Sequence, residues 1–72
     1  MIIGDRVKKE TFLRSNYPGK PTIIEAVFEY GKIVGFEETY AYVKFINYRI
    51  IQTEMISDLI PVSALEWKSR LK

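Results

Sequence analysis

The sequence predicts one small, mainly β domain of about five antiparallel strands with a short C-terminal helix. Its 72 residues leave room for one domain with one core, so we expect residues 1–72 to form a single unit. Apolar residues make up 47% of the chain and fall into short runs. Glycine, proline, asparagine and aspartate separate these runs, which is the pattern of a small all-β fold.

The N-terminal third contains one clear strand followed by a polar stretch. The turn pair Gly4-Asp5 precedes residues 6–11, whose many charged side chains would discourage pairing with another strand. We therefore predict an edge strand there. Residues 13–21 contain two prolines and a glycine, which predict a loop.

Residues 22–30 fit two local structures. Thr22 and Glu25 have the spacing of a helix capping box, and Gly31 could end such a helix. Most of the apolar residues in this stretch are β-branched or aromatic, which favours a strand. We favour the strand, and the helix remains the alternative.

The middle of the chain contains the clearest strands. Residues 31–37 form one of them, and Gly35 in its interior predicts a bulge or a sharp bend. A tight turn at Glu38-Thr39 leads to a strand over residues 40–47 with alternating sides. Burial should place Ala41, Val43 and Phe45 inward. The opposite face then presents Tyr40, Tyr42 and Lys44.

The last third should close the sheet and end in a helix. Residues 49–56 form another β-rich run, Ser57-Asp58 a turn, and residues 59–62 a closing strand with Pro61 at an edge. Ser63 and Glu66 fit a capping box that begins a helix extending to about Arg70.

The predicted core combines side chains from the sheet and the helix. Leu65 should dock on the end of the sheet, and Trp67 should cover that end through the helix. The side chains expected to share one dry interior are Val7, Ile33, Val43, Phe45, Ile60 and Leu65.

Four segments carry a resemblance to a known fold: Gly4-Asp5-Arg6-Val7, Gly31-Lys32-Ile33-Val34-Gly35-Phe36, Ala41-Tyr42-Val43-Lys44-Phe45 and Ile60-Pro61-Val62-Ser63-Ala64-Leu65-Glu66. With them the chain resembles an SH3-like small β-barrel. Similar layouts occur in KOW-type domains of ribosomal and transcription proteins, in the SH3-like accessory subunit of photosystem I, and in small uncharacterised bacterial and phage proteins. Residues 12–30 depart from the KOW pattern. The resemblance implies a fold and no functional residue.

The composition excludes several kinds of chemistry. The chain has no cysteine and no histidine, so it has no thiolate nucleophile, no imidazole base and no Cys/His zinc site. Glu37 and Glu38 are adjacent, and neighbours on a strand point to opposite faces. We therefore expect no enzyme, no catalytic residue, no metal and no cofactor.

Two sets of residues are candidates for binding. Tyr40, Tyr42 and Lys44 could stack and neutralise single-stranded nucleic acid, with Arg6 and Lys8 meeting phosphates. The same tyrosines could instead stabilise the sheet by cross-strand pairing, and scattered charges usually only solvate a surface. Trp67, which we expect to cover the core, could alternatively anchor a protein interface.

Two hypotheses for function follow. The first is a non-catalytic interaction module that binds a protein partner or forms a homo-oligomer. The alternative is a nucleic-acid-binding SH3-like barrel, which a net charge of +2 permits without requiring. No apolar run approaches the ~20 residues of a membrane span, and no signal-peptide pattern is evident. We expect a cytoplasmic protein that does not bind membranes.

Overall fold

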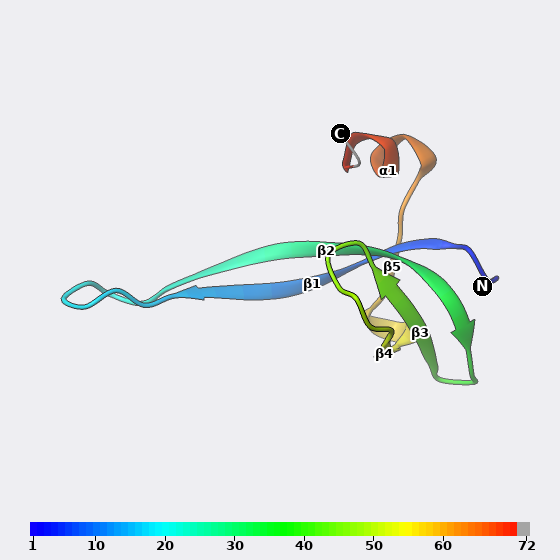
Figure 1. The fold of residues 1–72 in the computed structure, drawn as a ribbon, viewed down its shortest axis with the longest axis horizontal. Helices are drawn as coiled ribbons and strands as arrows, with labels where there is room; N and C mark the ends of the chain where they lie inside the picture. The colour runs from blue at the N-terminus through cyan, green and yellow to red at the C-terminus, as the bar shows by residue number, and fades with distance from the viewer. Residues whose placement is uncertain (71–72) are drawn as a thin grey trace.

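Five antiparallel strands and one short helix make up the computed structural model, which describes residues 1–70. The elements in chain order are β1 (Arg6–Ser15), β2 (Ile23–Phe36), β3 (Tyr40–Phe45), β4 (Gln52–Met55), the 3-10 turn η1 (Ile56–Asp58), β5 (Ile60–Pro61) and α1 (Ala64–Arg70). Figure 1 shows one curved sheet with α1 to one side of it. The predicted class, mainly β with five antiparallel strands and a C-terminal helix, is confirmed.

The strands form a single sheet in the order β4-β3-β2-β1-β5. The short strand β5 pairs with β1 at Val7 and Lys8, and β2 pairs with β1 on its other side. The prediction that β1 is an edge strand is therefore wrong at its start, because β5 returns from the far end of the chain to pair there. Pro61 lies in the edge strand β5, as predicted.

A long hairpin joins β1 and β2. The register runs without a break from Arg6 opposite Lys32 to Ser15 opposite Ile23. Of the ambiguous stretch 22–30, residues 23–30 thus belong to a strand and form no helix. The loop predicted for residues 13–21 is too long, since residues 13–15 pair with β2 and both prolines of that stretch lie between the strands.

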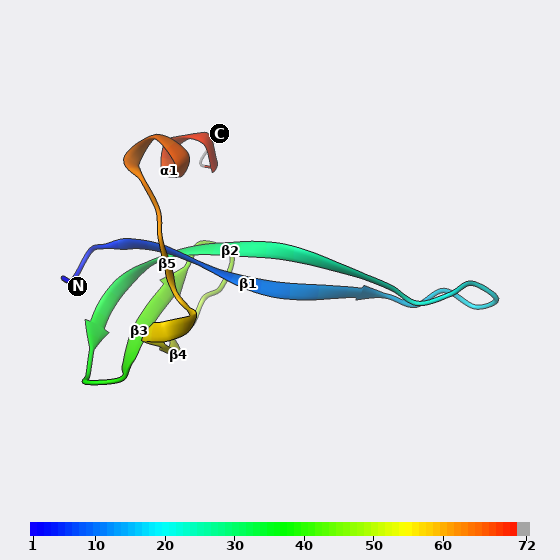
Figure 2. The same ribbon diagram turned by 180° about the vertical axis from the view of Figure 1, so that it is seen from behind.

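Beyond the core, the hairpin continues as a projection that we call the arm, residues 10–28. Its two strands pair with each other, while β5 pairs with β1 only up to Lys8 and β3 pairs with β2 only from Gly31 onward. Figures 1 and 2 show the arm extending away from the rest of the sheet. It accounts for the elongated shape, whose principal extents are 47 × 28 × 22 Å.

A bulge bends β2 where it meets β3. The pairing register shifts between Ile33 and Gly35, which confirms the bulge predicted from Gly35. The turn predicted at Glu38-Thr39 joins β2 to β3, and the amide of Glu37 donates a 2.8 Å hydrogen bond to the carbonyl of Tyr40.

The strand predicted at residues 49–56 is shorter than expected. Only Gln52–Met55 pairs with β3. The preceding residues form a turn, in which the amide of Tyr48 donates to the carbonyl of Phe45 over 3.2 Å. The expected turn at Ser57-Asp58 lies within η1.

The core lies on the concave side of the sheet, which we call the core face. Its buried side chains are Val7, Ile33, Ala41, Val43 and Phe45, with Ile56 and Leu59 packed against them. The alternation predicted for β3 is therefore confirmed. Ile60 and Leu65 were expected in this core and are instead 42% and 77% exposed. Ile60 pairs with Lys8 and so shares the opposite, outer face.

Helix α1 packs on the outer face rather than on the core. The hydroxyl of Ser63 accepts a 3.1 Å hydrogen bond from the amide of Glu66, which confirms the predicted N-cap. Trp67 is buried, whereas Leu65 points away from the sheet. The expectation that Leu65 docks on the sheet is wrong because contacts of Glu66 and Trp67 decide which side of the helix faces it.

Candidate functional site

A polar cluster on the outer face joins α1 to the base of the arm. The ammonium Nζ of Lys8 donates to the carboxylate Oε2 of Glu66 over 2.8 Å. The hydroxyl of Tyr30 donates to the same oxygen over 2.6 Å. The guanidinium of Arg70 lies 4.7 Å from the centre of the Tyr30 ring. Lys8, predicted as a phosphate contact, therefore has a structural partner in Glu66.

These contacts shift two ionisation equilibria in opposite directions. The hydrogen bond from Lys8 holds the pKa of the Glu66 carboxyl below its usual value, and the hydroxyl of Tyr30 adds to this effect. The same hydrogen bond raises the pKa of the Lys8 ammonium. Both shifts favour the charged pair, so the cluster attaches α1 to the sheet most firmly between the two pKa values.

Acid is expected to weaken this attachment. A carboxyl whose pKa is lowered by folding stabilises the fold above its unfolded value of about 4.5, and this contribution disappears as the pH falls through the lower folded value. Trp67, the only tryptophan, reports the docking of α1 by its fluorescence. We expect Glu66→Gln to be less stable than wild type at neutral pH. Its urea midpoint should also depend less on pH below about 4.5.

The exposed turn residue Glu38 supplies the control for this measurement. Glu38→Gln should keep the acid dependence of the wild type. Alkaline pH should weaken the same attachment. Because folding raises the pKa of Lys8, its contribution to stability is complete below the unfolded value of about 10.5 and is lost as the pH rises through the higher folded value. Equal acid profiles for wild type and Glu66→Gln would contradict this role of the cluster.

A row of three cations crosses the outer face next to this cluster. Arg6 lies directly opposite Lys32, and Lys32 lies directly opposite Lys44. We call these three residues the cationic row. Residues directly opposite on neighbouring strands share a face, and like charges there repel. The Lys32 ammonium lies 5.6 Å from the centre of the buried Trp67 ring, which offsets part of that repulsion.

The tyrosines predicted as a stacking surface lie beside the cationic row. The rings of Tyr40 and Tyr42 are 5.8 Å apart and nearly perpendicular, at 85°. Tyr42 is half-buried, and this burial, with a contribution from Tyr40, raises the pKa of its hydroxyl. The ammonium of Lys44 donates to the carbonyls of Phe45 and Tyr48. These side chains thus pack edge to face or bond to the backbone rather than forming one flat open surface.

The structure brings some of the predicted residues together and separates others. Arg6 and Lys44 share the cationic row, whose middle member Lys32 the sequence reasoning missed. The sequence signal for Lys32 is its position next to Ile33 in the predicted strand, which places it on the face opposite the core. Trp67, considered as an interface anchor, is buried under α1 and is not available as an exposed contact.

The arm carries large apolar side chains on both of its faces. Phe12 and Ile24 lie on the outer face and are 63% and 58% exposed, and they line a shallow hollow together with Arg14. Leu13 and Ile23 are exposed on the other face. This surface was not predicted, because part of it falls within the loop predicted for residues 13–21. The sequence signal for this surface is the adjacent apolar pairs Phe12-Leu13 and Ile23-Ile24, because neighbours on a strand point to opposite faces and cannot both face one core.

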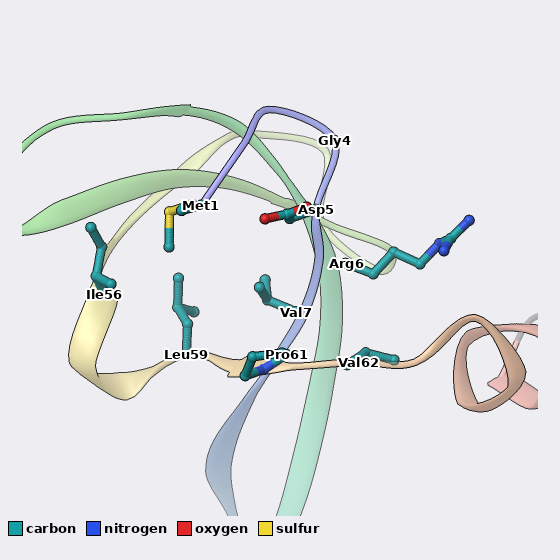
Figure 3. Close-up of a pocket in the computed structure, with 9 residues that line it drawn as sticks. All are labelled: Met1, Gly4, Asp5, Arg6, Val7, Ile56, Leu59, Pro61 and Val62. Atoms are coloured by element: carbon teal, nitrogen blue, oxygen red, sulfur yellow. The ribbon is translucent and has the colours of Figure 1, made fainter.

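A hollow of about 460 Å³ opens beside β5, near the N-terminus. Figure 3 shows Val7, Leu59 and Ile56 on its walls, while the side chain of Arg6 points away from it. The carboxylate of Asp5 also lines the hollow, and it accepts a 2.9 Å hydrogen bond from the amide of Ile2. This lining is suited to an apolar group of a ligand or partner.

Comparison of the chain with protein-family models, curated proteins and solved structures found no match. Within residues 1–70, no group of three or more acidic side chains is placed to hold a metal ion. No helix in the same residues is long and apolar enough to cross a membrane.

Proposed function

We propose that this chain is a non-catalytic interaction module that binds another protein chain through its arm. One observation carries the proposal: the arm pairs only with itself and exposes large apolar side chains on both faces. A two-stranded hairpin of this kind is at best marginally stable in water on its own. A partner chain that covers the arm would order it as well as bind it.

The size of the exposed surface supports this function. Fully burying a large apolar side chain contributes about 1.5–3 kcal/mol relative to leaving it exposed. Phe12, Leu13, Ile23 and Ile24 together can therefore supply several kcal/mol to an interface. Exposed apolar groups of this kind, such as Phe12 and Ile24 around one hollow, are more typical of a binding site than of ordinary protein surface.

The rest of the molecule serves, in this proposal, as the scaffold. The strand order β4-β3-β2-β1-β5 and the 3-10 turn before β5 are compatible with an SH3-like barrel, and we retain that fold as part of the proposal. We also propose a cytoplasmic location, as is typical of small domains without disulfides.

Photo-crosslinking from the arm tests this function. A photoreactive amino acid at Ile24 should give protein adducts when the chain is irradiated in its source cells. The same amino acid at Leu65 is the matched control, because Leu65 is at least as exposed and lies on α1, away from the tip of the arm (Figure 1). No adduct from position 24, or equal adducts from both positions, would overturn the proposal.

The cationic row favours a second candidate, the nucleic-acid-binding alternative. Arg6, Lys32 and Lys44 could follow a phosphate backbone across three strands, and Tyr42 lies beside them. Fluorescence anisotropy with single- and double-stranded oligonucleotides at low salt tests it, with Lys32→Glu as the informative variant. Absence of binding at low salt would rule it out, because the electrostatic attraction is strongest there.

A further inference from the structure

The arm has an open strand edge along β1. Strand residues direct their peptide groups alternately to the two sides. The carbonyl of Asp5 accepts from Ile33 on the β2 side, and the carbonyl of Arg6 accepts from Val62 on the β5 side. The even-numbered residues of β1 thus face the β5 side, and β5 pairs no further than Lys8. Glu10, Phe12 and Arg14 therefore present peptide groups along an edge that no strand of residues 1–70 occupies.

This edge lacks most of the features that prevent strand pairing. Proline, bulges and an excess of like charge usually protect edges. Residues 10–15 contain no proline, and their register with β2 has no shift. The two charges on the outer face of this stretch, Glu10 and Arg14, are of opposite sign. The edge is regular and able to accept another strand.

We propose that the partner of this edge is the β1 edge of a second copy of the chain, paired antiparallel about a two-fold axis through Phe12. This inference rests on the proposed use of the arm for binding. In this register Glu10 lies opposite Arg14 of the second copy, and Arg14 lies opposite its Glu10. The two Phe12 residues face each other on the outer face. The three residue pairs exchange their edge hydrogen bonds as antiparallel strands do.

Charge selects this register over its neighbours. An axis through Thr11 would place Glu10 opposite Phe12 of the second copy and Arg14 opposite Lys8, a like charge whose edge β5 already occupies. An axis through Leu13 would place Arg14 opposite Phe12 and leave Glu10 without a cation. Only the register centred on Phe12 pairs both charges.

The free edge of β2 is less suited to self-pairing. Glu25 and Glu29 share one face of β2, and an axis through Val27 would place Glu25 of each copy opposite Glu29 of the other. The β1 register also fits the available length. It uses residues 10–14, the stretch between the end of the β5 pairing and the loop at the tip.

Self-pairing also places apolar side chains of the two copies side by side on the outer face. The two Phe12 rings become cross-strand neighbours, and aromatic cross-strand pairs stabilise a sheet. Glu10 of the second copy then lies beside Arg14, one of the residues that line the shallow hollow. The four arm strands of the two copies form one continuous sheet, which is wider than the marginal hairpin of a single chain.

Sedimentation of charge variants over a range of protein concentrations tests this pairing. We expect wild type to dimerise and either single variant, Glu10→Arg or Arg14→Glu, to weaken the dimer about tenfold or more, because each places like charges opposite one another. The double variant Glu10→Arg/Arg14→Glu should restore dimerisation. An equimolar mixture of the two single variants should form a heterodimer, since their charges are then complementary.

The control variant is Lys20→Glu, which makes the same change of charge in the exposed loop at the tip, outside the proposed register. It should dimerise as wild type does. A wild type that remains monomeric, or single variants that dimerise normally, would overturn the self-pairing. Recovery of dimerisation in the double variant or the mixture excludes misfolding as the cause of the single-variant effects.

The two proposals fail in different ways. If position 24 crosslinks to a different protein while the purified chain remains monomeric, the arm binds proteins and the self-pairing is wrong. If neither crosslinks nor a dimer form, both proposals are wrong. Crosslinks from position 24 to a second copy that are lost when Arg14→Glu is also introduced would support both proposals.

Discussion

Replacing Phe45 with alanine is expected to destabilise the domain by about 3–5 kcal/mol. Phe45 is 2% exposed, is among the largest fully buried side chains and packs edge to face on Tyr48 at 5.7 Å. It also lies at the end of β3 that faces Gly31 of β2, at the centre of the sheet. A domain of this size has a total stability of roughly 5 kcal/mol, so the variant should be largely unfolded at moderate temperature. Urea denaturation followed by circular dichroism measures this loss.

The control is Phe36→Ala, which removes the same side chain at a position that is 44% exposed at the end of β2. We expect this variant to lose about 1 kcal/mol or less, because much of the ring is already in water. Comparable losses in the two variants would show that Phe45 is not buried in the core as the structure has it.

The sequence was sufficient to predict β3 and its neighbours because their signals are local. The alternation from Tyr40 to Phe45 has a period of two, and a sheet with one buried face needs that period. The bulge at Gly35 and the N-cap at Ser63 are also local features, each tied to a residue type with few structural roles. These predictions agree with the structure.

The arm could not be predicted in the same way because it depends on pairing between distant residues. Leu13 and Arg14 lie in a polar stretch next to prolines, and local composition favours a loop. The hydrogen bonds of this stretch are made with residues on the far side of the loop. The short strand β5 and the exposure of Leu65 could not be predicted for the same reason, since both depend on where the chain returns to the sheet.

The candidate surfaces also differ in whether they depend on one strand or on pairing between strands. Tyr40, Tyr42 and Lys44 were predicted to share one strand face, and they do, because that inference needs only one strand. The cationic row depends on two strand registers, those of β1 with β2 and of β2 with β3, so Lys32 was missed. Glu66 was assigned to a capping box, but its carboxylate contacts Lys8 and Tyr30, which are far away in sequence.

Gly31 marks the point where the arm joins the core, and replacing it with alanine should be destabilising, by up to about 2.5 kcal/mol. A Cβ at this position would lie 2.8 Å from the carbonyl oxygen of Lys44 and 2.9 Å from the Cα of Phe45. Both atoms belong to the backbone of β3, so one of the two strands must move. Such overpacking typically costs about 1–3 kcal/mol, although alanine is otherwise favoured over glycine in a strand by about 0.5–1 kcal/mol. Urea denaturation followed by circular dichroism gives the free energy of unfolding.

Gly35→Ala separates this close approach from the general effect of replacing a strand glycine. A Cβ at Gly35 would meet only the ring atom Cδ2 of Tyr42, at 3.2 Å, and that half-buried side chain can shift by a few tenths of an ångström. We therefore expect Gly35→Ala to change the stability by less than about 1 kcal/mol. If Gly31→Ala is as stable as wild type, β2 and β3 are further apart at this point than the structure has them. The arm would then join the core through a looser junction.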